Sequence, residues 1–434
     1  METGVVGALM LRCKGLMIVL DGVGDHSCPE LQGLTPLEAA VTPNLDRMAQ
    51  DGITGLVDPI LPGVPVGTHT GTGVLMGLAP ADALRLARGP VEAAGVGLDL
   101  QPGEVVLRCN FATLVHEGNA FRIEDRRAGR IAEGTAELTA GLRDLDLGEG
   151  ILGDLYPATQ HRAVMRLRGP GLSAAITDTD PGDGRMALGL LPSQARDPGD
   201  GGALRAAQAV NRFVQEAHER LSAHPLNRQR QAKGLMPANG VLTRGAGEIK
   251  KLRNLVEHLG LRASVIAGER TVEGLGRLFG FRTVRKLGFS AMPHTDLDGK
   301  LAATLAELDR QDLVYLHIKG TDISAHDRDP QGKKACIERI DAMLSRLPRD
   351  GLVIGVTGDH STDSNLGRHC GDPVPSLMLG PNARRDAVTS FAESSCMTGG
   401  LGRISGTSFL VSMLDAMGAM GNYRPVDRGF LFPR

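Results

Sequence analysis

Three apolar segments of the chain each end in acidic or imidazole side chains. Asp21 follows "MIVL", Asp322 and His326 lie in "HIKGTDISAHD", and Asp359 and His360 lie in "VTGDHS". Apolar runs of this kind predict strands that are buried on both faces. In an open α/β sheet, ligands bind beyond the carboxyl ends of the strands, where side chains from distant segments meet. We therefore expect these five residues to form one site.

A sixth candidate, His369, lies in "GRHCGDPVP". Three Asp and three His are enough to hold two divalent cations. Carboxylate and imidazole ligands favour manganese or zinc, with magnesium at the more oxygen-rich position. Each residue alone has a simpler explanation, since an Asp after a strand commonly caps a helix or a turn and a lone His is commonly a surface or core residue. The recurrence at three strand ends favours a two-metal site.

The segment "PVGTHTGTG", residues 65–73, places hydroxyl side chains between glycines. Glycine lets a ligand approach the backbone closely, so a Gly/Thr run before an apolar segment is typical either of a phosphate-binding loop or of a turn. The segment by itself does not distinguish a phosphate-binding loop from a turn, so the other residues of the expected site must be considered with it.

The elements that must position these residues alternate between strands and helices. Leu16–Leu20 predicts a buried strand, and "TPLEAAVTPNLDRMAQDG" predicts a helix that stops at Gly52. The strand and helix patterns that return after Leu261 predict a doubly wound, mostly parallel sheet. Between them, strand patterns and the long amphipathic stretch "GDGGALRAAQAVNRFVQEAHERLSAH" predict a second, inserted α/β domain, and "PGDGRMALGLLPSQARDPGDGG" predicts a surface loop. We expect a core of residues 1–90 and 261–434 and an insert of residues 91–260.

Composition narrows the class of partner. A chain of 434 residues is too long for one hydrophobic core. Its net charge of −2 and its lack of Trp argue against a nucleic-acid or charged membrane surface, and the sequence has no apolar run of membrane-spanning length. Six scattered cysteines without a Cys-x-x-Cys pair fit reduced thiols in the cytoplasm. We expect a cytoplasmic protein with a small-molecule partner, with a homo-oligomer left open, and a short N-terminal extension.

Several motifs follow one another in an order that resembles a known family. "TPLEAAVTPNLDRMA", "RGPVEAAGVG", "RCNFATL", "DRRAGRI", "HIKGTDISAHD", "GDHST" and "HCGDPVP" together resemble the alkaline phosphatase superfamily, and within it the cofactor-independent phosphoglycerate mutases of the archaeal type. The resemblance covers nearly the whole chain. It implies an alkaline-phosphatase-like α/β core that binds two metal ions (Mn, Zn or Mg), and an inserted substrate-binding lid.

The resemblance also implies roles for individual residues. One metal ion would be held by Asp322, His326 and His369, and the other by Asp21, Asp359, His360 and the hydroxyl of the nucleophile. A Gly-Ser-Asp-x-x-His segment of the family aligns with residues 67–72, so that Thr68 stands in place of the nucleophilic serine, His69 in place of the aspartate and Thr72 in place of the histidine. A metal-bound threonine hydroxyl at a helix N-terminus is chemically able to attack phosphorus. The alternative is that Thr68 only caps a helix in a protein that has lost phosphotransfer.

The expected substrate contacts lie mostly in the insert. They are Arg108, Asn110, Arg126, Arg127, Arg130, Arg162 and Arg244 there, and His69, Lys300 and Lys319 in the core. Arginines of this kind would grip the carboxylate and the phosphate of a small phosphorylated substrate. For Lys319, beside a metal-ligand pair, a salt bridge is the competing interpretation.

The chain departs from the family pattern close to the expected site. Besides residues 68–72, Asp363 in "GDHSTDSN" stands where proline is usual. We expect a phosphomutase that interconverts 3- and 2-phosphoglycerate, or a close analogue such as a phosphonate- or phosphinate-bearing glycerate of specialised metabolism, through phosphothreonine. A phosphohydrolase or phosphotransferase of the same fold and a catalytically silent binding homologue are the alternatives.

Overall fold

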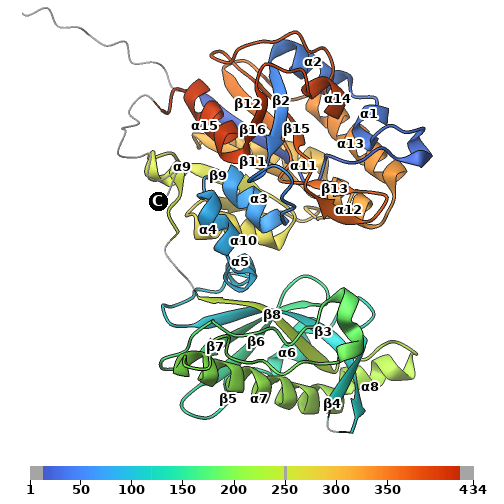
Figure 1. The fold of residues 1–434 in the computed structure, drawn as a ribbon, viewed down its shortest axis with the longest axis vertical. Coiled ribbons are helices and arrows are strands. Elements are labelled where there is room, and N and C mark those ends of the chain that lie inside the picture. Colours follow the sequence, from blue (N-terminus) through green and yellow to red (C-terminus); the bar gives the residue numbers. More distant parts are fainter. Residues whose placement is uncertain (1–12, 119, 249–251, 421–434) are drawn as a thin grey trace, which may run out of the picture. The chain divides into compact units, whose positions relative to one another are not determined.

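The computed structural model describes residues 13–118, 120–248 and 252–420, which form two compact units (Figure 1). Unit 1 contains the chain up to residue 85 and from residue 252 onward, and unit 2 is formed by residues 86–251. Both junctions lie ahead of the expected ones at 90/91 and 260/261. Helix α5 (Arg88–Gly95) belongs to unit 2 because it packs directly on its sheet: a Cβ on Gly89 would lie 2.1 Å from the backbone oxygen of Val106. The expected N-terminal extension lies outside the described residues.

Unit 1 is built on an eight-stranded sheet with the order β10-β9-β11-β1-β12-β15-β2-β16. The strands are β1 (Lys14–Leu20), β2 (Ile53–Asp58), β9 (Ala263–Ile266), β10 (Arg282–Val284), β11 (Leu313–Ile318), β12 (Leu352–Thr357), β15 (Val374–Leu379) and β16 (Gly402–Ser405). Neighbouring strands are parallel except at β15, which runs antiparallel to both β12 and β2. The predicted mostly parallel sheet is confirmed.

Helices cover both faces of this sheet, as a doubly wound fold requires (Figure 1). On one face, α1 (Pro36–Ala39), α2 (Pro43–Asp51), α11 (Leu297–Leu308), α13 (Pro330–Leu344) and α14 (Glu393–Cys396) share an apolar cluster with Leu16, Ile18 and Leu20 of β1. On the other face lie α3 (Thr68–Leu75), α10 (Arg270–Leu278) and α15 (Gly406–Ala416). Shorter helices are α4 (Pro80–Arg85), α9 (Leu255–His258) and α12 (Gly320–His326).

The single helix expected over "TPLEAAVTPNLDRMAQDG" is two helices. Thr35 begins α1 with a capping box to Glu38, and the chain leaves the helix before Pro43 starts α2. Proline has no amide hydrogen and disfavours a helical residue before it, so the apolar spacing continues while the helix does not. Gly52 follows α2 as its C-cap, as expected.

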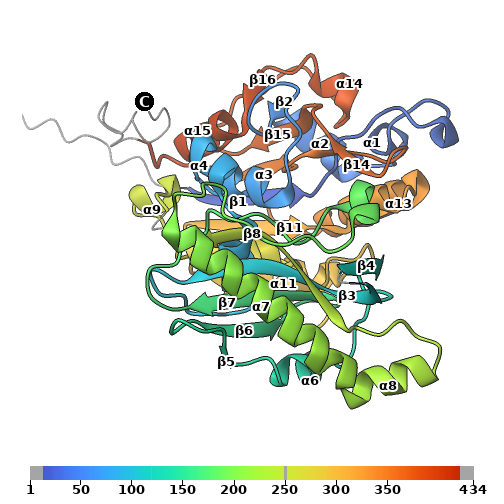
Figure 2. The ribbon, with the colours of Figure 1, turned by 60° about the horizontal axis from the view of Figure 1, so that its bottom comes forward.

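Unit 2 has a sheet of six strands: β3 (Val105–Glu117), β4 (Ala120–Asp125), β5 (Leu145–Asp146), β6 (Leu152–Pro157), β7 (Arg162–Arg168) and β8 (Gly240–Glu248). The long strand β3 pairs with β4, β7 and β8, and every pairing between these strands is antiparallel. Helix α7 (Gly201–Ala223) runs along one face of the sheet (Figure 2) and buries Val210 and Phe213 against Leu107 and Phe111 of β3. Helices α6 (Thr135–Ala140) and α8 (Pro225–Ala232) complete the unit.

Two further sequence expectations concern loops and thiols. The predicted surface loop before α7 contains a short 3₁₀ segment, Asp183–Leu188. The six cysteines are all free thiols. Among the described residues, no helix is both long enough and apolar enough to cross a membrane.

Candidate active site

The site lies where three adjacent parallel strands of unit 1 end. Leu20 of β1 is paired with Ile318 of β11, and Val19 is paired with Thr357 of β12. The residues that follow these strands, Asp21, Lys319 and Asp359 with His360, therefore emerge at one edge of the sheet, as the sequence predicted.

The first predicted ligand set, Asp322, His326 and His369, is brought together. Asp322 and His326 lie four residues apart on one face of α12, and His369 comes from β14 (Arg368–Cys370). Both histidine Nε2 atoms lie 3.5 Å from Asp322 Oδ1 and 3.0 Å from each other. Asp322 is buried, whereas the side chain of His326 is 40% exposed, so this end of the site is open to solvent.

The orientation of the two imidazoles fits a bound cation. His326 Nδ1 lies 2.8 Å from the backbone oxygen of Gly367, and His369 Nδ1 lies 2.7 Å from that of Val66. A carbonyl oxygen can only accept, so in each neutral ring Nδ1 carries the hydrogen and Nε2 presents a lone pair. Two lone pairs that face each other beside a carboxylate repel one another unless a cation lies between them. Backbone acceptors of this kind commonly orient metal-binding histidines.

The second predicted set surrounds Thr68. His360 Nε2 lies 3.2 Å from Asp21 Oδ1, 3.8 Å from Asp359 Oδ2 and 3.4 Å from Thr68 Oγ1, and Thr68 Oγ1 lies 3.5 Å from Asp21 Oδ2. The three Asp and His side chains are fully buried. Ligand atoms of Asp21, Asp322 and His360 lie within 4.8 Å of one another, so this set adjoins the first one.

Lys319 lies between the two sets. Its ammonium is 2.9 Å from Asp21 Oδ2, 2.7 Å from Asp322 Oδ2 and 2.8 Å from Thr68 Oγ1. Lys319 thus forms the salt bridges with Asp21 and Asp322 and also contacts Thr68, the expected nucleophile.

The glycines next to Thr68 allow its helix to approach the strand ends. Thr68 is the first residue of α3, after Gly67 as N-cap. A Cβ on Gly71, one turn further on, would lie 1.9 Å from the backbone oxygen of Asp359, so a larger residue there would push the helix away. Thr72 donates a hydrogen bond of 2.9 Å to Asp359 Oδ2 and so orients this carboxylate. The Gly/Thr segment is therefore the start of a helix built against the site.

Two residues of the site were not predicted. His317 is buried within β11, with Nε2 3.1 Å from Asp21 Oδ2. Thr362 donates to Asp322 Oδ1 at 2.7 Å and lies 3.1 Å from His360 Nδ1, and so links the two sets. The sequence did contain a signal for His317, because it is the one imidazole within the apolar run "LVYLHI".

Charge in this site is unbalanced. Burial alone would raise the pKa of Asp21, but Lys319 and the nearby histidines outweigh it and hold that pKa well below its usual range. Burial is also the largest single influence on the pKa of Asp322, but Lys319 and the three nearby histidines together outweigh it and lower that pKa. Burial and the charge of Asp21 raise the pKa of Asp359. Three carboxylates thus share a single ammonium, a donor set that fits divalent cations.

Four of the ten expected substrate contacts line one face of the sheet of unit 2. Arg108 and Asn110 alternate on β3 and are paired with Arg244 of β8 and Arg162 of β7 respectively. These four side chains therefore share a face, opposite the one covered by α7. We call them the arginine face.

Other charged groups adjoin the arginine face. Burial lowers the pKa of Arg108 to about 9, where Glu92 raises it and Arg162 and Arg244 lower it. The pKa of His161 falls to about 3 because of its burial and the neighbouring guanidinium groups, among them those of Arg127 and Arg130. Positive charge is therefore concentrated here.

Some buried polar atoms of this face lack a hydrogen-bond partner within the part of the chain that the structure describes. They include Oδ1 of Asn110 and, beside this face, Nδ1 of His161. Nε of Arg108 also has no hydrogen bond but lies 3.7 Å from Glu92 Oε1 in an ion pair. Arg126, by contrast, makes a two-pronged ion pair with Asp180, with distances of 2.9 and 2.6 Å. This arginine is already neutralised by a carboxylate of its own unit.

Lys300, another expected substrate contact, is fully buried in α11 and donates to the backbone oxygen of His317 at 3.2 Å. Its burial lowers its pKa to about 8. A side chain held in this way braces β11, and its contact with a substrate stays a prediction. His69 is half-buried at the start of α3, with Nε2 3.3 Å from Thr70 Oγ1.

Comparison with known proteins identifies the family. Residues 49–227 match the family model for 2,3-bisphosphoglycerate-independent phosphoglycerate mutase. Proteins of that name from Archaeoglobus fulgidus and Methanopyrus kandleri are 42% and 40% identical to the chain, each over 93% of it and over 97% and 96% of their own lengths. The chain belongs to this family.

Solved structures agree with this membership. A cofactor-independent phosphoglycerate mutase from Thermoplasma acidophilum matches with a TM-score of 0.66 and 30% identity, over 94% of this chain and 100% of its own. A protein of Pyrococcus horikoshii matches with a TM-score of 0.79 and 33% identity, over 94% of this chain and 98% of its own. The family resemblance and the α/β fold class predicted from the sequence are confirmed.

Proposed function

We propose that the protein is an intramolecular phosphotransferase that interconverts 3- and 2-phosphoglycerate, or a close analogue, through a phosphothreonine at Thr68. The main observation behind this proposal is the position of the Thr68 hydroxyl. Thr68 is the first residue of helix α3, and its Oγ1 lies 2.8 Å from the Lys319 ammonium and within 3.5 Å of Asp21 and His360. A hydroxyl at a helix start beside an ammonium is well placed to attack phosphorus.

The residues that would hold two divalent ions fit that role. Asp322, His326 and His369 would hold one, and Asp21, Asp359, His360 and Thr68 the other. Bound there, such ions would supply positive charge that acidifies a hydroxyl and neutralises phosphoryl oxygens. Manganese, zinc and magnesium all accept ligands from this set, so the metal in use is a matter for measurement.

In the proposed reaction, a bond forms between Thr68 Oγ1 and phosphorus while the bond from phosphorus to the substrate oxygen breaks. The substrate alkoxide takes up a proton, and the Thr68 hydroxyl gives one up. The reverse transfer, to the neighbouring hydroxyl of the same glycerate, restores Thr68. Throughout, the Lys319 ammonium stabilises negative charge on Oγ1, and Thr72 keeps the Asp359 carboxylate in orientation.

Taken by itself, the arginine face of unit 2 would recognise a small anion. A carboxylate and a phosphate are the anions that guanidinium groups recognise best. The buried Oδ1 of Asn110, which has no hydrogen-bond partner among the described residues, supports a polar ligand on this face, because such an atom is costly to leave without one. Arg127, Arg130 and Arg162 would add charge around it.

An assay of both products tests the proposal. The manganese-loaded protein is given 3-phosphoglycerate, and 2-phosphoglycerate and free phosphate are measured together. Formation of 2-phosphoglycerate without matching phosphate release is expected. Release of phosphate alone would instead support the phosphohydrolase alternative, and neither product would point to another substrate or a silent protein.

Thr68→Ala tests the intermediate. We expect the variant to lose the covalent phosphate detectable by intact mass and to lose activity by several orders of magnitude. Manganese binding should persist, since three of the four ligands of that ion remain. Thr70→Ala, in the same helical turn, is the matched control and should keep the phosphoenzyme. Phosphate found on any other residue would refute the assignment to Thr68.

A further inference from the structure

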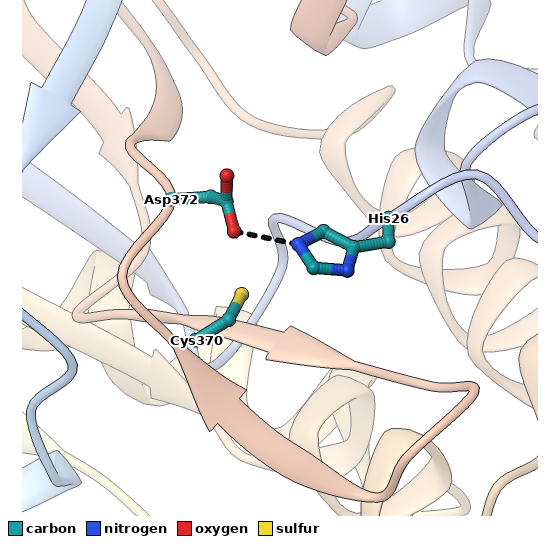
Figure 3. A group of neighbouring side chains, drawn as sticks. All are labelled: His26, Cys370 and Asp372. Atoms are coloured by element: carbon teal, nitrogen blue, oxygen red, sulfur yellow. Dashed lines mark hydrogen bonds and ion pairs between the residues drawn. The ribbon is translucent and has the colours of Figure 1, made fainter. Parts of the chain in front are cut away.

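A second group of metal-ligating side chains lies outside the site described above. His26, Cys370 and Asp372 place one ligand atom each within 4.8 Å of one another. Figure 3 shows the three side chains converging, with the imidazole of His26 directed at the carboxylate of Asp372. None of them belongs to the two predicted ligand sets. All three are at least partly accessible to solvent, which gives an ion a path of entry.

This group is built on the opposite face of a hairpin that also serves the active site. Strand β13 (Ser361–Asp363) pairs antiparallel with β14, so that Thr362 lies opposite His369 and Ser361 lies opposite Cys370. Side chains alternate between the two faces of a strand. Thr362 and His369 accordingly face the active site, whereas Asp363 and Cys370 point to the other side.

Asp363, the residue that replaces the proline expected from the family, completes the arrangement. Its Oδ1 accepts backbone hydrogen bonds from Asn365 and Leu366 within its own turn, and its Oδ2 lies 3.3 Å from His26 Nδ1. The side chain of Asp363 is only 3% exposed. A carboxylate held in this way keeps the hydrogen of a neutral imidazole on Nδ1 and turns the lone pair of Nε2 outward. This is the relation between a carboxylate, a histidine and a metal ion that recurs in metal sites.

His26 Nε2 faces a second acceptor on its other side, Asp372 Oδ2 at 2.6 Å. A carboxylate and an imidazole lone pair cannot share this contact without a positive species between them, either a proton or a metal ion. The thiol of Cys370 hydrogen-bonds the same Asp372 carboxylate, and its deprotonated form is a strong ligand for a soft metal ion, which adds a third donor to the pair.

We infer that His26, Cys370 and Asp372 form a third metal site that takes a zinc-class ion, with Asp363 as its orienting carboxylate. Thiolate, imidazole and carboxylate together are a zinc donor set, and three protein ligands leave a fourth position for water. Ligands on a tetrahedral zinc ion lie about 3.3 to 3.8 Å apart, given bonds of about 2.0 to 2.3 Å. Modest side-chain rotations would therefore widen the 2.6 Å contact between His26 and Asp372 and bring the three donors, now within 4.8 Å of one another, to this spacing. An ion here would fasten the loop after β1 to the hairpin that carries His369. The inference does not depend on the proposed reaction.

Cobalt provides a probe that separates this site from the active site. The full-length protein is stripped with a chelator, loaded with manganese and titrated with Co²⁺. A thiolate-to-cobalt charge-transfer band in the near ultraviolet requires a cysteine ligand, which the two active-site ligand sets lack. We expect the band to appear, and added Zn²⁺ to abolish it. Absence of the band from the wild-type protein would overturn the inference, whether or not the protein is a mutase.

Variants then assign the ligands. Cys370→Ser should remove the band, and Cys13→Ser, at another partly exposed cysteine, should keep it. Asp363→Asn leaves all three ligands in place and should weaken cobalt binding about 10- to 100-fold while the band is recovered at saturation. A band that survives Cys370→Ser would show that another thiol binds cobalt. Unchanged affinity in Asp363→Asn would refute the role of that carboxylate. Circular dichroism of each variant checks that it is folded.

Discussion

At the scale of single residues, the site depends on which atom of each side chain faces inward. His326 and His369 are turned by backbone oxygens of Gly367 and Val66, which hold Nδ1 and leave Nε2 for the site. Both residues lie in segments quoted in the sequence analysis, but neither is a predicted site residue, since only their backbone oxygens take part. The orientation of the imidazoles is therefore set by backbone atoms whose role a motif does not reveal.

Lys319 gives a prediction at this scale. Lys319→Met removes the ammonium that lies 2.8 Å from Thr68 Oγ1, and we expect phosphoenzyme formation to slow about 10²- to 10³-fold, as for loss of one preorganised charge donor. Rapid-quench measurement of covalent phosphate checks this. Lys319→Arg should not restore the rate, because a planar guanidinium cannot reproduce a compact ammonium between three oxygens.

Metal binding separates this role from simple structural damage. Without the ammonium, Asp21 and Asp322 lose their competing cation, so manganese should bind Lys319→Met at least as tightly as it binds the wild type. A variant that loses manganese and phosphoenzyme together would contradict the proposed role of Lys319.

At the scale of elements, one buried cation holds the active-site loops in place. Lys333 of α13 donates to the backbone oxygens of Gly24 and Thr362 and pairs with Asp25 at 2.7 Å, with both side chains fully buried. Asp25 in turn accepts from the backbone amide of Ser364 at 2.9 Å. A helix far along the chain thus fixes the loop after β1 against β13.

Lys333→Met should therefore be costly. It leaves the Asp25 carboxylate buried without a cation, and the free energy of unfolding should fall by about 3 to 5 kcal/mol. Urea denaturation measures the change. The double variant with Asp25→Asn should recover part of the loss, because the unpaired charge is then gone; no recovery would indicate that packing, and not charge, is what Lys333 supplies.

At the scale of the whole molecule, the residues proposed to bind metal ions and the arginines proposed to bind an anion lie in different units. The predicted metal-ligand sets belong entirely to unit 1, and the arginine face belongs entirely to unit 2. Each unit also has its own apolar core. Loss of metal ions should therefore affect one unit more than the other.

Chelation tests this division. After removal of metal ions, hydrogen exchange should accelerate in the loop after β1, in α12 and in the β13–β14 hairpin, because a ligand that binds only the folded state stabilises it. The strands β3 and β7 and helix α7 of unit 2 serve as internal controls and should exchange as before. Equal acceleration in both units would show that the metal ions stabilise the molecule as a whole.

The sequence by itself determined the family and the mostly parallel core, and it predicted which residues would serve as metal ligands. Apolar runs that end in Asp or His are local patterns, and parallel strands bring such ends to one edge. Local patterns also predicted correctly that the helix before Gly52 ends there. They did not predict the break before Pro43, nor the antiparallel pairing of the strands in unit 2.

Only the tertiary structure decided which side chains meet. In the folded chain Lys300 is fully buried, and His317 and Thr362 lie in the site beside the predicted residues. His26 contacts Asp372, which is 346 residues away in the sequence. The physical reason is that contact, burial and hydrogen-bond orientation depend on packing between distant segments. A motif specifies the type of a side chain, whereas its neighbours specify which of its atoms is available for chemistry.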